Sequence, residues 1–367
     1  MPVTESRAPY MEWAKTRPAP AIDLAGSNLL ACSLSDLPGA REALDLAGES
    51  PEGYAPLVEA IASCYGVAPD RVATAGGCSG ANVLAMAALV EGGEDVLIES
   101  PNYDPLPGAA RLLGARVVTF DRRFEEGYRI DPDRVAAAIG PETRLIVVTN
   151  PHNPSGVLAS EEELSGLARV AERTGTPVLF DEVYLDTVLE KRPAPAATRA
   201  PLFVTSNSLT KAYGLASLRC GWTLASPEIT RRIRRVRDVM DVWSPIPSDR
   251  LSVVAFHSMD RLAQRTRRIV DANTRLIRAF LVARPELSCV ESRATIAFPR
   301  LLGASDASAF VRRLFDEAGV AVVPGSFFGS RAHFRISFGG ATEELERGLA
   351  RIGRCLDGLA ADQNLAT

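Results

Sequence analysis

The sequence has few of the residues that build metal centres, disulfide frameworks or membrane spans. Its 367 residues include six cysteines and three histidines, and neither group forms a close pair with metal-ligand or redox spacing. A metal centre, a disulfide scaffold and a Ser-His-Asp triad are therefore poor interpretations. The longest apolar stretch, residues 81–90, contains Asn82 and is about half as long as a membrane-spanning helix.

An excess of charge of one sign is also missing. The formal net charge is -4, with Lys and Arg spread among Asp and Glu, so we expect no nucleic-acid partner and no membrane attachment. Residues 1–20 carry scattered charges and lack the apolar core of a secretory signal. The composition predicts a soluble, cytoplasmic protein with reduced thiols that acts on small molecules.

The length and the pattern of apolar runs predict two domains. Short apolar runs alternate with helical segments between about residues 55 and 225, which indicates a mostly parallel sheet covered by helices. The expected strands are 95–100, 115–120, 144–150, 177–182 and 202–208, and the expected helices are 78–91, 104–113 and 160–174. Ser160 and Glu163 fit a capping box at the start of the last helix.

The pattern changes after Trp243. A proline-marked break at 244–249 precedes a long Arg-rich helical stretch to about Arg284, followed by strand candidates at 294–299, 320–323 and 333–338 and helices at about 305–318 and 341–358. This is an α+β pattern. We expect a large domain at 46–245 and a small domain formed by 1–45 and 246–367.

Polar residues follow three of the expected strands at the point where each strand ends. They are His152 and Asn153 after the first, Asp181 to Tyr184 after the second, and Lys211 after the third. Ligands of parallel α/β sheets gather at the carboxyl ends of the strands. Each segment alone is typical of a loop turn, a cap or a solvated lysine, but their order and spacing together indicate one site.

Taken together, six segments resemble the class I/II aminotransferases, the aspartate-aminotransferase family of fold type I pyridoxal-phosphate enzymes. The segments are AGGCSGA (75–81), ESPNYDP (99–105), TNPHNPSG (149–156), DEVY (181–184), SLTKAYGLASLRCGW (208–222) and FRISFG (334–339). The resemblance covers roughly Ile22 to Ile352 and implies pyridoxal 5'-phosphate as cofactor. It also implies an amino acid and a 2-oxo acid as substrates, and a homodimer.

The resemblance implies a role for each residue around the cofactor ring. Lys211 matches the lysine that holds the cofactor as a Schiff base and then moves the substrate Cα proton. Asp181 matches the carboxylate that keeps the ring nitrogen protonated, which an electron sink requires. Asn153 and Tyr184 match the pair that hydrogen-bonds the phenolic oxygen, and Tyr103 the aromatic residue that stacks on the ring.

The phosphate and the substrate have implied partners of their own. Gly77 and Cys78 match the phosphate-binding amides at a helix start, and Ser208 and Arg219 the hydroxyl and guanidinium ligands. Arg335 matches the arginine that binds the substrate α-carboxylate, together with Asn153. Gly26 and Asn28 lie in a segment that the family brings over the substrate, although a plain loop explains them equally well.

The sequence departs from the family at Gly48, where many relatives have a tyrosine that reaches the neighbouring subunit's phosphate. Tyr54 or Ser50 are alternatives for that contact, which stays open. Transamination is the leading interpretation, and a lyase acting by β-elimination on a carbon–sulfur bond, or a specialised cyclase, is the alternative, because fold alone does not fix reaction. A non-catalytic ligand-sensing module would need a DNA-binding segment that the chain does not show, and a dehydrogenase would need a different glycine spacing than AGGCSG.

Overall fold

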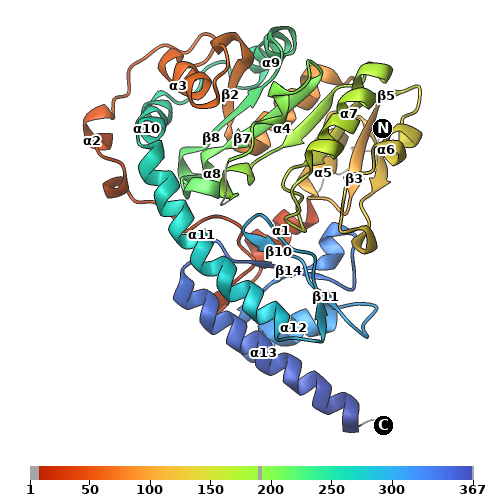
Figure 1. The fold of residues 1–367 in the computed structure, drawn as a ribbon. Coiled ribbons are helices and arrows are strands. Elements are labelled where there is room, and N and C mark those ends of the chain that lie inside the picture. The colour runs from red at the N-terminus through yellow and green to blue at the C-terminus, as the bar shows by residue number, and fades with distance from the viewer. Residues whose placement is uncertain (1–7, 189–191, 366–367) are drawn as a thin grey trace.

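A seven-stranded sheet forms the centre of the larger part of the molecule (Figure 1). The computed structural model describes residues 8–188 and 192–365. The strand order is β2-β8-β7-β6-β5-β3-β4, and all strands run parallel except β8, which is antiparallel to both of its neighbours. The strands are β2 (Val72–Gly76), β3 (Asp95–Ser100), β4 (Arg116–Asp121), β5 (Thr143–Thr149), β6 (Val178–Asp181), β7 (Phe203–Ser208) and β8 (Cys220–Leu224).

Helices cover both faces of this sheet because its inner strands are apolar on both sides. Alternate strand residues separate into two cores: Ile98 and Val147 pack with α4 (Gly77–Leu89), α5 (Pro105–Leu112) and α9 (Pro227–Met240). Leu97 and Ile146 pack on the opposite face with α6 (Pro132–Ala138) and α7 (Glu161–Thr174). The predicted capping box is confirmed, since Ser160 and Glu163 bond each other's backbone amides at the start of α7.

A further group of helices packs beside β8. Its core contains Trp222 together with residues of α3 (Ala55–Tyr65), α8 (Leu209–Tyr213) and α10 (Ile246–His257), and α2 (Ala40–Ala43) lies next to α10. Short 3-10 turns connect the elements, namely η1 (Leu34–Asp36), η2 (Pro69–Arg71), η3 (Phe124–Glu126), η4 (Leu185–Thr187), η5 (Ala196–Thr198), η6 (Ala216–Leu218) and η7 (Gly325–Phe328).

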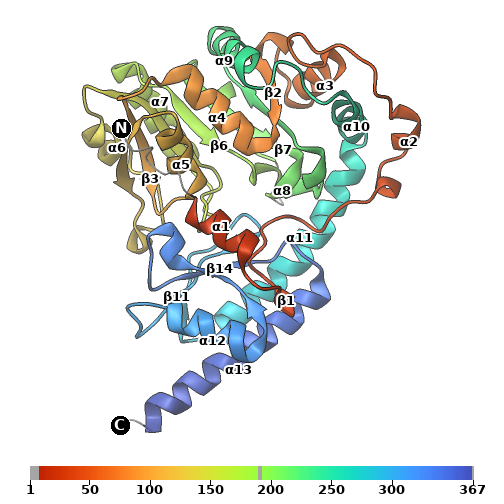
Figure 2. The ribbon, with the colours of Figure 1, turned by 180° about the vertical axis from the view of Figure 1, so that it is seen from behind.

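The smaller part lies below the carboxyl ends of the sheet strands and has its own apolar core (Figure 1). Its elements are α1 (Pro9–Thr16), β1 (Ile22–Asp23), α11 (Met259–Val282), β9 (Leu287–Ser288), β10 (Ile296–Ala297), β11 (Arg300–Leu301), α12 (Ser308–Ala318), β12 (Val320–Ala321), β13 (Val323–Pro324), β14 (Phe334–Ser337) and α13 (Thr342–Leu365). Strand β1 pairs with β12, so the N-terminal segment joins the C-terminal part. Figure 2 shows α1 between this part and the sheet.

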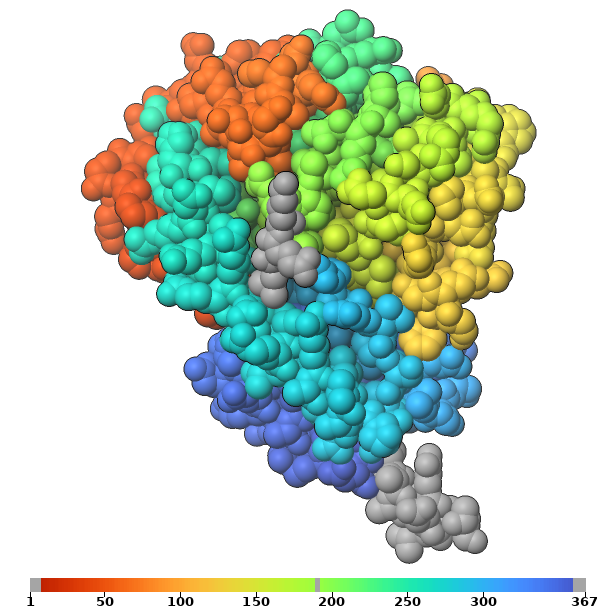
Figure 3. All heavy atoms as spheres, in the orientation of Figure 1, coloured from red at the N-terminus to blue at the C-terminus, as the bar shows by residue number. Residues whose placement is uncertain are grey.

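The long helix α11 connects the two cores. Leu262 near its start belongs to the core around Trp222, whereas Ile277 near its end belongs to the core of the smaller part. The all-atom view in Figure 3 shows α10 and α11 as one continuous surface along both parts. The predicted domain boundary at residue 246 stays a prediction, and the packing of α10 against α3 favours a later division, within α11. The helical break falls at Ser258, while Pro245 and Pro247 stand at the start of α10.

Candidate active site

Lys211 lies in α8, directly after the carboxyl end of β7. Ser208 caps this helix by accepting a hydrogen bond from the Thr210 amide, which fixes the start of α8. The Lys211 Nζ atom donates to Ser27 Oγ at 2.9 Å and to Asn28 Oδ1 at 2.7 Å. Burial lowers the pKa of Lys211 to about 7, and the positive charge of Arg335 acts in the same direction. The amine can therefore act as a nucleophile or base near neutral pH.

Asp181 ends β6 and lies at the bottom of the same site. Asn82 Nδ2 donates to its Oδ2 at 2.8 Å, and the Val183 amide donates to its Oδ1 at 3.2 Å. The Cys78 thiol also donates to Oδ1, at 3.3 Å. Burial raises the pKa of Asp181, and the Asn82 hydrogen bond is the strongest effect in the opposite direction. These donors orient the carboxylate and favour its ionised form.

Asn82 itself is held by a second residue of the sheet. Ser206 Oγ, on β7, donates to Asn82 Oδ1 at 2.5 Å, so the amide nitrogen of Asn82 points to Asp181. All three side chains are at most 5% exposed. Water cannot compete for these hydrogen bonds, and the network is rigid.

Glycines and an arginine pack closely together at the start of α4. Gly77 has a φ of +76° and begins the helix, whose first amides have no intrahelical acceptor. Arg219, with a φ of +50°, lies against it and donates to the Gly76 carbonyl at 3.1 Å. A Cβ at Gly77 would lie 2.2 Å from Arg219 Nη2, and a Cβ at Gly221 would lie 2.2 Å from the Gly77 carbonyl carbon. The free amides at a helix start and a guanidinium beside them are groups that suit an anion.

Arg335 lies on β14 in the smaller part and is completely buried. Its Nη1 donates to Asn153 Oδ1 at 2.8 Å, and its Nη2 donates to the Tyr10 hydroxyl at 2.7 Å. The backbone of Asn153 is fixed as well, because its backbone amide donates to Thr149 Oγ1 at 2.8 Å. The guanidinium makes no ion pair within the described residues.

Two aromatic residues belong to the site, the buried Tyr184 and the partly buried Tyr103. Tyr184 is 1% exposed, and burial raises its pKa to about 12. Tyr103 precedes α5, and its hydroxyl donates to Met11 Sδ at 3.3 Å. Its ring stands edge-on to that of Tyr10, with centroids 5.9 Å apart. Both hydroxyls are protonated at neutral pH and can donate hydrogen bonds.

A buried ion pair lies next to Thr149, at the end of β5. Glu99 and Arg122 are 2.7 Å apart and neither side chain is exposed. Glu99 Oε1 also accepts from the amide and the hydroxyl of Thr149, the residue that holds Asn153. The pair therefore fixes the end of β5.

The structure brings most of the residues predicted from sequence into one region. Lys211, Asp181, Arg335 and Arg219 are close enough for their charges to interact, and Asn153, Tyr184 and Tyr103 are near Arg335. Of the two loop residues, Asn28 contacts Lys211. Gly26 is exposed and donates to Asp23 Oδ1 at 3.2 Å instead. For Cys78 we predicted a role of the backbone alone, and the structure adds the contact of its thiol with Asp181.

Four residues of the site were missed by the sequence reasoning: Tyr10, Ser27, Asn82 and Ser206. Asn82 interrupts an otherwise apolar helical stretch, which was a usable signal for a buried polar contact. Tyr10 reaches the site through long-range packing of the N-terminal segment, which no local pattern indicates, whereas Ser27 stands between the two predicted residues Gly26 and Asn28.

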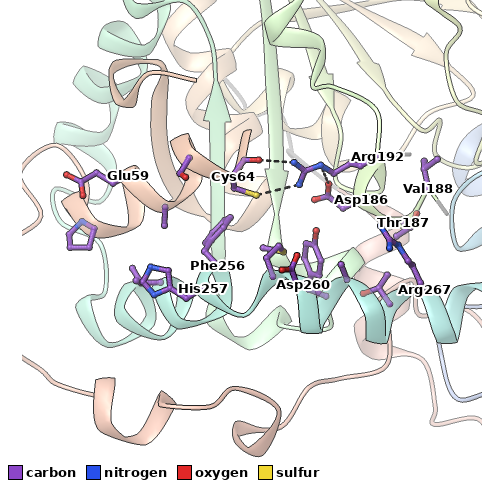
Figure 4. A pocket seen from close by; sticks show the side chains of 18 residues that line it. Glu59, Cys64, Asp186, Thr187, Val188, Arg192, Phe256, His257, Asp260 and Arg267 are labelled. Atoms are coloured by element: carbon purple, nitrogen blue, oxygen red, sulfur yellow. Dashed lines mark hydrogen bonds and ion pairs between the residues drawn. The ribbon is translucent and has the colours of Figure 1, made fainter. Parts of the chain in front are cut away.

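A cavity of about 720 Å³ lies between α3, α10, α11 and the loop after β6 (Figure 4). There Arg192 donates to the Cys64 carbonyl at 2.8 Å and pairs with Asp186 at 3.8 Å. None of the predicted site residues lines this cavity.

The residues around Lys211 fit pyridoxal phosphate. An amine whose pKa is lowered to about 7 suits an aldehyde, a buried carboxylate held by hydrogen-bond donors suits a ring nitrogen that must stay protonated, and the glycines with Arg219 suit a phosphate. Within the described residues no cluster of three or more metal-ligating side chains occurs, and no helix is long and apolar enough to cross a membrane.

Comparisons with known proteins identify a family and several similar chains. Residues 47–352 match the family model described as aminotransferase class I and II. Capreomycidine synthase of Streptomyces vinaceus is 31% identical over 77% of this chain and 73% of its own length. Aspartate/prephenate aminotransferase of Thermus thermophilus is 29% identical over 83% of this chain and 82% of its own. A pyridoxal-phosphate-dependent aminotransferase from Streptococcus suis superposes with a TM-score of 0.90 at 25% identity, covering 97% of this chain and 98% of that one.

Proposed function

The chain belongs to the class I and II aminotransferases, and from this premise we propose a role for each residue around Lys211. The protein is a pyridoxal-phosphate-dependent enzyme that moves an amino group between an amino acid and a 2-oxo acid. Pyridoxal phosphate supplies the aldehyde that takes up the amino group and the ring that accepts the electrons of the Cα–H bond. The proposal depends above all on one observation: Lys211 directly follows the carboxyl end of β7 and lies close enough to interact with Asp181, a buried carboxylate held by Asn82.

Lys211 holds the cofactor through its amine and later moves the proton at the substrate Cα. A lysine with an ordinary pKa would be protonated at pH 7 and unable to accept that proton. Burial and the nearby Arg335 remove this obstacle. Asp181 holds the proton of the ring nitrogen, and Asn82 keeps the carboxylate oriented.

The remaining residues orient the cofactor and the substrate. Arg335 binds the α-carboxylate, because it is a buried cation without an anionic partner among the described residues. Asn153 and Tyr184 hydrogen-bond the phenolic oxygen, and Tyr103 stacks on the ring. The phosphate is bound by the amides of Gly77 and Cys78, the Ser208 hydroxyl and Arg219.

Reduction with borohydride tests the role of Lys211 directly. The chain has three lysines, Lys15, Lys191 and Lys211, so peptide mapping of the reduced holoenzyme identifies the attachment point. We expect the cofactor mass on Lys211 alone. The Lys211→Ala variant should fold and carry no covalent cofactor, whereas the control Lys15→Ala should be labelled like the wild type. A label on another lysine contradicts the assignment.

Elimination or cyclisation on the same scaffold is the second candidate reaction. The similarity to capreomycidine synthase is the observation that favours it. Transamination and elimination both begin by removal of the Cα proton, and they differ in which group leaves the substrate afterwards. We test this by adding single amino acids to the holoenzyme without an acceptor. Transamination releases one equivalent of 2-oxo acid per site and stops, while elimination releases 2-oxo acid and ammonia continuously.

We also propose that the protein is a homodimer. Exposed apolar side chains gather on two segments that lie together, with Leu44 and Leu46 on one and Val239, Val242 and Trp243 on the other. Ser50 and Ser244 join these segments by a hydrogen bond of 2.6 Å. Sedimentation should give twice the mass of one chain, and Trp243→Glu should weaken the dimer. The cytoplasmic location stays a prediction.

A further inference from the structure

An open hollow of about 420 Å³ lies at the boundary between the two parts of the molecule. One wall comes from the ends of β3 and β4 and from η3, and the other wall comes from residues 300–305 and 329–333 of the smaller part. None of the residues that we assign to the cofactor or the substrate lines it. Its volume is in the range of roughly 300–1,000 Å³ that is usual for small-molecule sites.

The lining of the hollow carries more positive than negative charge. Four arginines stand against two carboxylates, those of Asp121 and Glu125, which gives a net charge of +2. The arginines are Arg122, Arg123, Arg300 and Arg331. Burial lowers the pKa of His333, which also lines the hollow, to about 4, so its ring is neutral at pH 7. The chain as a whole has a charge of -4, and the hollow is therefore a local site for an anion.

Three of these arginines form ion pairs at the surface. The pairs are Arg123 with Glu126 at 3.4 Å, Arg300 with Glu125 at 3.2 Å and Arg331 with Asp306 at 3.0 Å. The three arginine side chains are 56%, 41% and 74% exposed. Exposed ion pairs contribute little free energy, so these guanidinium groups can exchange a carboxylate for a bound anion at small cost.

Two buried side chains of the lining each have one nitrogen without a hydrogen-bond partner among the described residues. Arg122 is 2% exposed; its Nη1 donates to Glu99 and its Nε to the Tyr128 carbonyl, while Nη2 has no acceptor. His333 is 7% exposed, and its Nδ1 is unpaired. The Tyr128 hydroxyl has no other acceptor in the described part of the chain, so it donates to His333 Nε2, and Nδ1 carries the ring hydrogen. Buried donors are rarely left unpaired, and an oxyanion, directly or through a water, supplies the missing acceptor.

We propose that this hollow is a second ligand site, which binds a phosphate group that is either free or carried by a small metabolite. A phosphate dianion matches the net charge of the lining, and its oxygens match the donor fork of arginine. It would contact Arg123 of the sheet part and Arg300 and Arg331 of the smaller part, and it would thus connect the two parts. This binding does not depend on the reaction at Lys211.

Calorimetry with inorganic phosphate tests the site in the borohydride-reduced holoenzyme, whose cofactor occupies its own phosphate site. We expect saturable binding at millimolar phosphate and weaker binding of acetate, which has a single charge. A parallel titration with glycerol 3-phosphate distinguishes the two sources: tighter binding indicates a phosphate ester, and equal or weaker binding indicates free phosphate. If neither phosphate compound binds saturably, or if acetate binds as tightly, the proposal is wrong.

Substitutions of exposed residues locate the binding. Arg123→Gln and Arg331→Gln should each raise the Kd for phosphate about 5-fold, which corresponds to about one exposed charge pair. Glu125→Gln removes a negative charge from the lining and releases Arg300, so it should lower the Kd. Arg235→Gln is the matched control, because Arg235 is as exposed as Arg123, at 56%, and lies on α9 outside the hollow. Wild-type affinity in both Arg123→Gln and Arg331→Gln, or weaker binding in Glu125→Gln, overturns the proposal.

Two further variants separate this proposal from the proposed function. Arg219→Gln changes the cofactor phosphate site and Arg335→Gln changes the carboxylate site, and neither residue lines the hollow. Both variants, loaded with cofactor, should bind phosphate in the hollow with the affinity of the wild type. Loss of phosphate binding in either variant would place the phosphate in the active site and contradict a separate site.

Discussion

The substitution Gly77→Ala is the most direct test of the phosphate site. An added Cβ would lie 2.2 Å from Arg219 Nη2 and 2.7 Å from its Cζ, so the guanidinium has to move. The backbone at this position has a φ of +76°, which costs an alanine about 1–2 kcal/mol. The backbone strain lowers the stability of the apoprotein, whereas displacement of the Arg219 guanidinium should lower the affinity for the phosphate.

The two costs therefore appear in different measurements. Loss of one hydrogen bond to a charged group is worth about 1.5–3 kcal/mol, which raises the Kd for pyridoxal phosphate roughly 10- to 150-fold. The free energy of unfolding of the apoprotein should fall by about 1–2 kcal/mol. Titration of apoprotein with cofactor, followed by absorbance, gives the first value, and urea unfolding gives the second.

Gly80→Ala provides the control on the same helix. A Cβ there would have Ala75 Cβ as its nearest neighbour, at 3.8 Å, an ordinary contact. Replacing a glycine inside a helix should raise stability by about 0.5–1 kcal/mol and leave cofactor affinity unchanged. Equal affinities of Gly77→Ala and wild type would refute the assignment of this surface to the phosphate.

Three other predictions follow from the site. Because the pKa of Lys211 is lowered to about 7, the rate at which the apoprotein binds pyridoxal phosphate should rise with pH through about 7 and level off above it. Stopped-flow absorbance measures this rate. A rate that still rises at pH 10 would indicate a lysine with an ordinary pKa. Asn82→Ala removes the main donor to Asp181 and should raise the Kd for the cofactor roughly 10-fold, while Asn82→Gln should restore part of the loss. Glu99→Gln leaves the buried Arg122 without its anion and should lower the free energy of unfolding by about 3–5 kcal/mol, as urea unfolding would show.

The sheet and the order of its helices could be predicted because their signals are local. Continuous apolar runs specified β3, β5, β6 and β7, and the Ser160 cap specified the start of α7. The position of the site at the strand ends followed from the parallel topology. The antiparallel strand β8, which lies between β2 and β7, could not be placed, since its position depends on pairing far along the chain.

The short strands of the smaller part were harder to predict for the same reason. The candidate 294–299 contains only β10, at Ile296–Ala297, because the pairing with β14 is limited to two residues. Likewise Tyr10 meets Arg335 across 325 positions of sequence. Such contacts are decided by how the N-terminal segment docks, through β1 and β12 and through Asp104, and not by the residues next to Tyr10.

Arg335 lies close enough to Lys211 to change the proton affinity of its amine. Arg335 lowers the pKa of Lys211 while no anion is bound, which keeps the amine neutral and able to hold the cofactor. A substrate carboxylate on Arg335 neutralises that charge, and the proton affinity of Lys211 then rises. The amine thus becomes a stronger base when the Cα proton has to be removed. Asp181, which Asn82 holds in place, acts on Lys211 in the same direction as such a carboxylate, because its negative charge raises the pKa of the amine.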